Sequence, residues 1–189
     1  MSENTIYTIG HGNRKQEVIL EFLEKYNIKY LIDVRSLPYS KFNPTFNQTD
    51  IKYFLKKNGI KYVFMGDSIG GRPTDPTCYD TEGKVDYELV KEKDFFIQGI
   101  QRLITAYEKK INVVLLCSES KPIECHRSKL IGRVLAKKNI ILQHIDEKGT
   151  LKDQITIINE LNKGLSEIDL FGNHINTTSR KSYLDDDES

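Results

Sequence analysis

Short apolar segments alternate along the chain with longer segments in which apolar residues recur every three or four positions. The short segments predict strands and the longer ones predict amphipathic helices. Predicted strands cover residues 5–9, 30–34, 60–64, 113–117 and 140–145, and predicted helices cover residues 16–26, 49–58, 87–110, 127–138 and 151–162. This alternation predicts a single α/β domain with about five strands in a largely parallel sheet and helices on both faces.

Two segments lack this periodicity. Residues 66–86 are rich in glycine and contain two prolines, which predicts a functional loop or lid and not a domain linker. From Leu165 the apolar pattern fades, and residues 185–188 are all acidic. We therefore expect residues 1–164 to form the domain and residues 165–189 to form a mobile or loosely docked tail.

Composition narrows the class of protein. The chain has 189 residues, of which 38% are hydrophobic, and its 28 basic and 27 acidic side chains give a net charge of +1. Such a charge gives no general attraction for nucleic acid, although it leaves room for a local basic patch. No apolar run is long enough to span a bilayer and no signal pattern begins the chain, so we expect a cytoplasmic protein without a membrane partner. The oligomeric state is left open.

Three cysteines, an odd number in a chain of this size, favour a reducing compartment. Their thiols then serve reactivity, metal binding or packing. Cys78 lies in a polar segment without a nearby partner, and we take it as incidental.

The loops that follow the strands carry the candidate chemistry, because the carboxyl ends of parallel strands meet at one edge of the sheet. After the first strand, Gly10 and Gly12 flank His11 and allow backbone N–H groups to approach a ligand. His11 either acts in the site or caps the next helix. Neither a GxGxxG pattern nor a Walker lysine follows, which excludes a nucleotide-binding loop of those kinds.

After the second strand, Asp33 and Arg35 face the same side. They either form a structural ion pair or converge on a ligand pocket at this edge of the sheet. In such a pocket the planar fork of Arg35 suits a phosphate, sulfate or carboxylate. Phe46, in a stiff loop further on, either covers the pocket or fills the core. After the third strand, Gly71 and Arg72 form a second anion clamp or an ordinary surface loop.

The loop after the fourth strand carries the strongest pattern. A buried strand delivers Cys117, and Cys125 starts the next helix. The helix dipole and nearby cations lower the pKa of a thiol at a helix start, so Cys125 is the stronger candidate for a thiolate. Cys117 is either a second functional thiol or a core cysteine. The surrounding residues offer an acid or base, an imidazole, an anion holder and a hydroxyl donor: Glu119, His126, Arg127 and Ser128.

Together these segments resemble the domain of unknown function 488 family. The resemblance rests on four motifs in order: Thr8-Ile9-Gly10-His11; Asp33-Val34-Arg35-Ser36 with Pro38 and Asn43-Pro44-x-Phe46-Asn47; Gly70-Gly71-Arg72; and Leu116-Cys117-x-Glu119 with Pro122 and Cys125-His126-Arg127-Ser128. It spans about residues 5 to 145. Gly12 departs from it, because such proteins commonly have a small hydroxyl residue there. The resemblance implies the fold and the site but no activity.

Three functions compete. The first is an enzyme, a hydrolase or transferase, in which a cysteine thiolate attacks a phosphorylated or nucleotide-like anion. Its expected catalytic residues are Cys125, Cys117, His11 and Glu119, and its expected substrate-binding residues are Arg35, Arg72, Arg127, His126, Asp33, Gly71 and Ser128. The order of strand, cysteine, loop, arginine and helix is similar to that of tyrosine phosphatases and rhodaneses. Neither Cys117 nor Cys125, however, has the arginine spacing of a phosphatase loop.

The second function is a metal site formed by Cys117, Cys125, His126 and His11, which zinc or iron would accept. The spacing disfavours it, and we expect neither a metal nor another cofactor. The third is a binding module for a nucleic-acid fragment, in which the arginines contact phosphate and Tyr39, Phe42 and Phe46 stack on bases.

Overall fold

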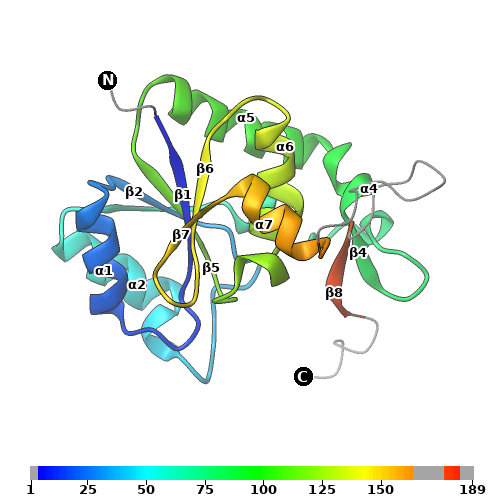
Figure 1. Ribbon diagram of the computed structural model, residues 1–189. Coiled ribbons are helices and arrows are strands. Elements are labelled where there is room, and N and C mark those ends of the chain that lie inside the picture. Colours follow the sequence, from blue (N-terminus) through cyan, green and yellow to red (C-terminus); the bar gives the residue numbers. More distant parts are fainter. Residues whose placement is uncertain (1–3, 164–176, 184–189) are drawn as a thin grey trace.

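The computed structural model describes residues 4–163 and 177–183. Its main sheet contains β1 (Ile6–Gly10), β2 (Tyr30–Asp33), β3 (Lys61–Phe64), β5 (Val113–Cys117), β6 (Leu142–Ile145) and β7 (Leu151–Asp153). The strand order is β3-β2-β5-β1-β6-β7 (Figure 1). Strands from β3 to β6 run parallel, and β7 pairs antiparallel with β6. The predicted single α/β domain with a largely parallel sheet is confirmed, with a sixth strand at one edge.

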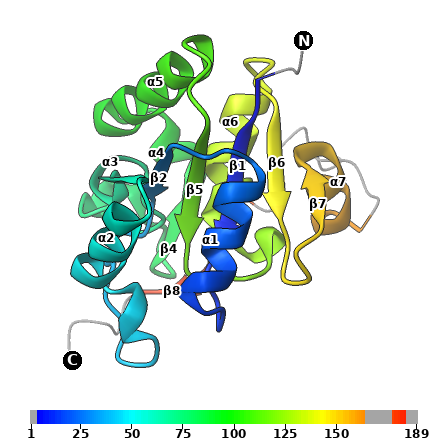
Figure 2. The ribbon, with the colours of Figure 1, turned by 90° about the vertical axis from the view of Figure 1, so that its left-hand side faces the viewer.

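Helices cover both faces of this sheet. On one face, α1 (Gln16–Lys25) and α2 (Gln48–Lys57) pack their buried residues against the sheet. In Figure 2, α1 lies in front of the sheet and α6 (Arg133–Ala136) lies behind it. The other face also carries α3 (Gly66–Ile69) and α5 (Asp94–Glu108). Each face therefore has its own apolar core.

The central strand β5 is buried along its whole length. Its side chains alternate between the faces, as they must in a strand. Val114 and Leu116 belong to the core under α1 and α2, whereas Leu115 and Cys117 belong to the core on the α5 side. The last side chain of β5, Cys117, therefore lies on the face of the sheet that also carries Cys125 and Leu130.

Three predicted helices differ from the observed ones. The helix expected over 87–110 is interrupted. α4 (Tyr87–Lys91) ends before Lys93, which has extended backbone angles and directly precedes α5. The helix expected over 127–138 starts as a π-helix, Arg127–Gly132, and continues as α6. The helix expected over 151–162 is shorter, because residues 151–153 form β7 and α7 spans Gln154–Leu161.

The segment between β3 and α4 contains ordered elements. After α3 it forms a 3₁₀ helix, Pro76–Cys78, and then β4 (Lys84–Asp86). β4 pairs antiparallel with β8 (Thr178–Ser182) in a small second sheet. Within the predicted tail, residues 164–176 and 184–189 lie outside the described residues. None of the described helices is long and apolar enough to cross a membrane.

Candidate functional site

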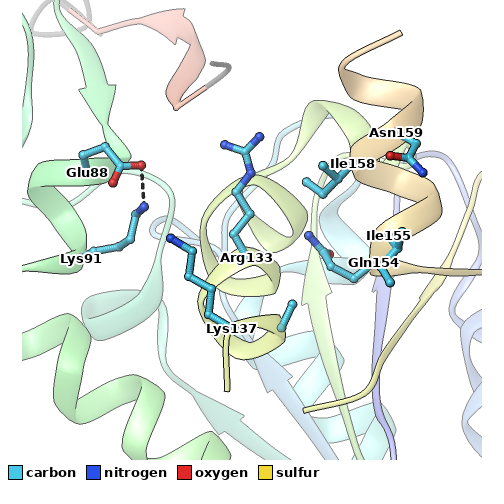
Figure 3. Close-up of a pocket in the computed structure, with 9 residues that line it drawn as sticks. Glu88, Lys91, Arg133, Lys137, Gln154, Ile155, Ile158 and Asn159 are labelled. Carbon is cyan, nitrogen blue, oxygen red and sulfur yellow. Dashed lines mark hydrogen bonds and ion pairs between the residues drawn. The ribbon is translucent and has the colours of Figure 1, made fainter. Parts of the chain in front are cut away.

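One cavity lies away from the predicted site residues. It measures about 360 Å³ and is enclosed by α4, α6 and α7 (Figure 3). Its wall carries the basic side chains of Lys91, Arg133 and Lys137, and Lys91 pairs with Glu88. Because this wall contains no cysteine or histidine, it offers no nucleophile of the kind that the sequence predicts.

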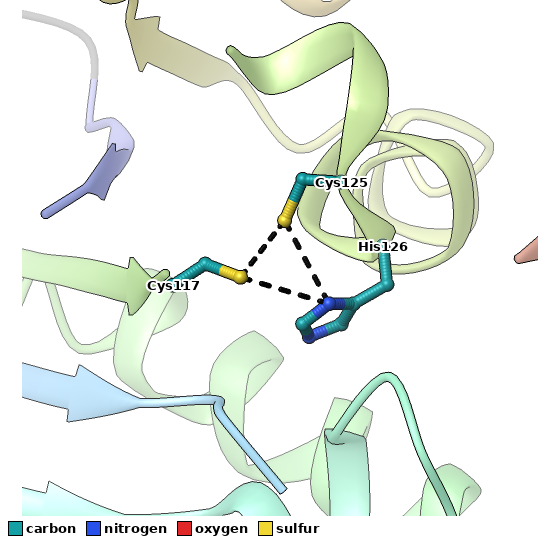
Figure 4. Close-up of side chains that lie close together, drawn as sticks. All are labelled: Cys117, Cys125 and His126. Carbon is teal, nitrogen blue, oxygen red and sulfur yellow. Dashed lines mark hydrogen bonds between the residues drawn. The ribbon is translucent and has the colours of Figure 1, made fainter. Parts of the chain in front are cut away.

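The thiol pair lies at the carboxyl edge of the sheet, where Cys117 ends β5 and Cys125 precedes the π-helix. The two Sγ atoms are 2.9 Å apart, and Cys125 donates a hydrogen bond to Cys117. The Nδ1 atom of His126 is 3.8 Å from the Cys117 sulfur and 3.7 Å from the Cys125 sulfur (Figure 4). Both thiols are buried. The structure thus brings together three residues that the sequence predicted for the site.

Two backbone contacts fix the ring of His126. Its Nε2 atom lies 3.1 Å from the carbonyl oxygen of Val34, which can only accept a hydrogen bond. The Nε2 atom therefore carries a proton, and Nδ1 faces the sulfurs. Gly71 packs against the same ring, where an added Cβ would lie 2.6 Å from Nδ1. No larger residue fits at position 71 unless the ring moves.

The surroundings favour a negative charge on Cys117. Burial alone would raise its pKa, but the hydrogen bond from Cys125 and the positive charges of His126 and Arg127 hold that pKa well below its usual value. Burial and the neighbouring Cys117 sulfur raise the pKa of Cys125. Burial opposes protonation of His126, yet the charge on Cys117 raises its pKa. The order that the sequence suggested for the two thiols is thus reversed, and Cys117 is the better thiolate.

Glu119 accepts a hydrogen bond from the thiol of Cys117. Its Oε2 atom is 2.9 Å from the Cys117 sulfur. Burial, followed by the charge of Cys117, raises the pKa of Glu119. The carboxyl group can therefore hold the proton that the thiol releases, and it can pass that proton on. Ser118 is exposed, and its hydroxyl lies 3.3 Å from the same carboxyl oxygen.

Arg127 is fully buried beside the thiols. Its Nη2 atom donates to the carbonyl of Ser120 at 2.8 Å, and its backbone N–H points at the Cys125 sulfur at 3.4 Å. Within the described part of the chain, its Nε and Nη1 atoms have no hydrogen-bond partner. Arg127 therefore acts on the thiols through its charge. Ser128 has a structural contact, because its hydroxyl donates to the carbonyl of Pro122.

Asp33 and Arg35 form a buried ion pair, which is one of the two arrangements that the sequence allowed. Arg35 donates to both carboxylate oxygens, from Nε at 2.8 Å and from Nη2 at 2.6 Å. Its Nη2 atom also donates to the carbonyl of Phe46, and the hydroxyl of Tyr62 donates to Asp33. The planar fork of Arg35 is thus occupied by protein groups.

His11 lies beside this ion pair, and its backbone N–H donates to the carbonyl of Cys117 at 2.9 Å, but its side chain is not one of the groups hydrogen-bonded to the sulfurs. Its ring stacks on the buried Phe46 with a centroid distance of 4.6 Å, and its Nε2 atom is 3.3 Å from Nη1 of Arg35. Its Nδ1 atom donates to the carbonyl of Gly12. Burial and the charge of Arg35 lower the pKa of His11. A neutral ring that is held in this way fits a packing role better than proton transfer to Cys117.

Arg72 lines a cavity of about 670 Å³ next to the loop that follows β2. Its guanidinium lies over the ring of Tyr183, and its backbone N–H donates to the hydroxyl of Ser36. Tyr79 and Tyr183 line the same cavity and meet edge to face. Gly71, which precedes Arg72, lies against His126 and so connects the wall of this cavity to the thiol cluster through the chain, although the cluster residues do not line the cavity.

Three of the four metal ligands that the sequence suggested come together. Cys117, Cys125 and His126 place one ligand atom each within 4.8 Å of one another, and the fourth candidate, His11, is not in this group. Two thiolates on one zinc ion lie about 3.8 Å apart, given Zn–S bonds of about 2.3 Å in a tetrahedron. The observed 2.9 Å between the sulfurs is shorter than this spacing.

Sequence reasoning missed the contacts that come from the backbone or from distant elements. The carbonyl of Val34 orients His126, and the hydroxyl of Tyr62 completes the shell of Asp33. The side chain of Tyr183 in the cavity with Arg72 was also missed. Only the Tyr62 contact has a signal in the sequence, because Tyr62 lies within the third predicted strand.

Fold and site together define a class: a mixed α/β protein with a buried thiol pair and a histidine at the carboxyl edge of its parallel sheet. A family model described as "Domain of unknown function DUF488" matches residues 15–134, which are more than half of the chain. The chain therefore belongs to this family, and the resemblance seen in its motifs is confirmed. Neither the curated proteins nor the solved structures gave a significant match.

Proposed function

We propose that the protein is a thiol-dependent enzyme in which the Cys117 thiolate attacks the electrophilic atom of a small anionic substrate. One observation carries this proposal: the Cys117 sulfur accepts a hydrogen bond from Cys125 at 2.9 Å and faces the Nδ1 atom of His126. Such surroundings stabilise the charged form of a thiol, which is its nucleophilic form.

The neighbouring residues take distinct roles in this proposal. His126 balances the charge of the thiolate, and Cys125 stabilises it with its S–H group. Glu119 gives its proton to the leaving group when the bond between sulfur and substrate forms and the bond to the leaving group breaks. Water or a second substrate then releases the covalent intermediate, so the reaction is a hydrolysis or a transfer.

The cavity of Arg72 is the best place for the anionic part of the substrate. Arg35 is occupied by Asp33, and Arg127 is buried beneath the loop that contains Ser120. Arg72 lines an open cavity together with Tyr79 and Tyr183, and a cation beside aromatic rings suits a phosphorylated or nucleotide-like molecule.

Alkylation by iodoacetamide across pH tests the nucleophile. An ordinary thiol with a pKa near 8.5 loses about tenfold in rate for each pH unit below that value. We expect Cys117 to be alkylated first, with a rate that changes less than about threefold between about pH 6 and pH 8. The matched control is the Cys78→Ser variant, whose profile should equal that of the native chain. Earlier labelling of Cys125, or a tenfold fall per pH unit for Cys117, would contradict the proposal.

A screen of phosphorylated compounds tests the activity itself. The Cys117→Ser variant should lose at least about a thousandfold in turnover, because the catalytic groups act as a unit. Arg72→Lys keeps the charge but loses the planar fork, so its main effect should be a higher KM. Full turnover by Cys117→Ser on a substrate found in this way would rule out the thiolate mechanism.

A second candidate is binding of a nucleic-acid fragment without catalysis. It is favoured by two exposed aromatic residues after β2, Tyr39 with 67% and Phe42 with 100% of its surface accessible. Phe46, also expected to stack on bases, is buried against His11. The slope of log affinity for a single-stranded oligonucleotide against log salt concentration tests this candidate. A slope near zero excludes substantial phosphate contact.

A further inference from the structure

We propose that Cys117 is oxidised by hydroperoxides such as hydrogen peroxide and that Cys125 then closes an intramolecular disulfide with it. This inference rests on the thiolate of the proposed function and adds a second reaction of the same sulfur, an oxidative modification. It gives Cys125 a covalent role, in addition to the hydrogen bond by which Cys125 stabilises the thiolate in the proposed substrate reaction.

The geometry of the pair brings the sulfurs close to bonding distance. They lie 2.9 Å apart, and a disulfide bond measures about 2.05 Å, so the sulfurs must approach by roughly 0.9 Å. Cys125 has extended backbone angles between a 3₁₀ turn and the π-helix, where rotation of its side chain need not break a regular helix. The third cysteine, Cys78, lies in the 3₁₀ helix Pro76–Cys78 with Asp75, Lys93 and Asp86 as its charged neighbours, and it does not belong to the thiol cluster.

The first step makes a sulfenic acid on Cys117. The thiolate attacks one peroxide oxygen, a sulfur–oxygen bond forms and the oxygen–oxygen bond breaks. Sulfur loses two electrons, and the leaving hydroxide takes a proton to become water. Glu119, whose carboxyl oxygen is 2.9 Å from the sulfur, is placed to give that proton.

The second step makes the disulfide. The Cys125 sulfur attacks the Cys117 sulfur, the new sulfur–sulfur bond replaces the sulfur–oxygen bond, and hydroxide leaves with the proton of the Cys125 thiol as a second water. Overall, two thiols and one hydroperoxide molecule give one disulfide and, with hydrogen peroxide, two waters. The product ties the end of β5 to the start of the π-helix and removes the nucleophile.

The experiment treats the full chain with hydrogen peroxide, blocks the remaining thiols with N-ethylmaleimide and maps the peptides by mass spectrometry. We expect a peptide within 111–127 that has lost two hydrogens and carries no label, and dithiothreitol should restore both thiols. The Cys125→Ser variant should instead trap a sulfenic acid on Cys117, which dimedone labels. The Cys117→Ser variant should leave Cys125 reduced, and Cys78→Ser should behave as the native chain.

The outcomes separate this inference from the proposed function. If no intramolecular disulfide forms while Cys117 is still alkylated rapidly at about pH 6, the oxidation inference fails and the nucleophile stands. If Cys117 is alkylated no faster than Cys78, both fail. Oxidation of Cys125 in the Cys117→Ser variant, at the rate of the native pair, would overturn the assigned order of the two thiols.

Discussion

At the scale of single residues, Gly71 is the position at which the site tolerates least change. A Cβ at position 71 would lie 2.6 Å from the Nδ1 atom of His126, which is also the ring atom that faces the two sulfurs, and the Nε2 atom is held by the carbonyl of Val34. A side chain at position 71 must therefore displace the ring from its position beside Cys117 or break its backbone hydrogen bond. The low pKa of Cys117 depends on this histidine, so the glycine acts on the thiol through it.

The Gly71→Ala variant should slow the alkylation of Cys117 at low pH. Displacement of His126 removes positive charge from the thiolate, so the pKa of Cys117 rises and less thiolate is present at about pH 6, where we expect at least a fivefold lower rate. At about pH 10 the thiol is ionised in both proteins and the rates should converge. Equal rates across the range would show that His126 does not control the thiol, and a lower rate at every pH would indicate a change of access instead.

At the scale of elements, a buried hydroxyl group helps to hold the small sheet of β4 and β8 together. The Ser179 hydroxyl accepts a hydrogen bond from the backbone N–H of Val85 at 2.9 Å, and both residues are buried. Tyr87 donates its N–H to the carbonyl of Thr177 at 2.8 Å, which ties the start of α4 to the same strand. β8 thus satisfies backbone groups that would otherwise be buried without a partner.

The Ser179→Ala variant should lose stability. It leaves the buried N–H of Val85 without an acceptor, which costs about 1–3 kcal/mol. Urea denaturation should show a lower midpoint with an unchanged slope. Lys181→Ala is the matched control, because Lys181 lies in the same strand and is exposed, and we expect less than about 0.5 kcal/mol for it. Equal midpoints for the two variants would contradict the role of Ser179.

At the scale of the whole molecule, one buried histidine connects the main sheet to the helices beside the site. His144 in β6 contacts the Thr8 hydroxyl through Nδ1 at 2.7 Å and the Gln154 amide oxygen through Nε2 at 2.6 Å. The amide nitrogen of Gln154 donates in turn to the carbonyl of Ser128 in the π-helix. Burial, with the charge of Arg127 as a smaller cause, lowers the pKa of His144 to about 3.

This chain of contacts predicts a loss of stability in acid. Between about pH 6.5 and pH 3 the unfolded chain binds a proton on His144 that the folded chain does not. Stability present above about pH 6.5 therefore falls on acidification, by up to about 1.4 kcal/mol for each pH unit from this residue. In denaturation experiments from about pH 7 to pH 5, the His144→Gln variant should show a shallower slope. If the variant does not fold, an NMR titration tests the native ring, and a pKa near 6.5 would contradict the prediction.

The sequence predicted the parts of this protein that follow periodicity. The parallel strands and the loops at their carboxyl ends were expected, because a buried strand such as 113–117 and an amphipathic helix such as 16–26 leave clear patterns. Two differences between the predicted and the observed elements have identifiable causes. The pattern of the π-helix Arg127–Gly132 is close to that of an α-helix, and its wider turn is fixed by contacts such as the one from Gln154. β4 is too short for an alternating pattern, β8 consists of polar residues only, and the two pair across almost a hundred residues.

The candidate site was also predicted only in part. Position in the sequence placed Cys117, Cys125 and His126 at one edge, but it could not decide which thiol carries the charge. That depends on which groups surround each sulfur. Cys125, His126 and Arg127 lower the pKa of Cys117, and the ring of His126 is positioned by the carbonyl of Val34 and by Gly71. The dipole of a helix start favoured Cys125, whereas the three-dimensional neighbours favour Cys117.

The strand order has a consequence for synthesis on the ribosome. β1 and β2 follow each other along the chain, yet β5 lies between them, and both neighbours of β1 come from residues after 112. While the first hundred residues emerge, β2 can pair with β3, but the apolar side chains of Ile6 and Ile9 have no strand beside them. The nascent chain must keep β1 from aggregating until β5 is translated and enters the gap. The thiol at the end of β5 thus arrives with the strand that completes the sheet.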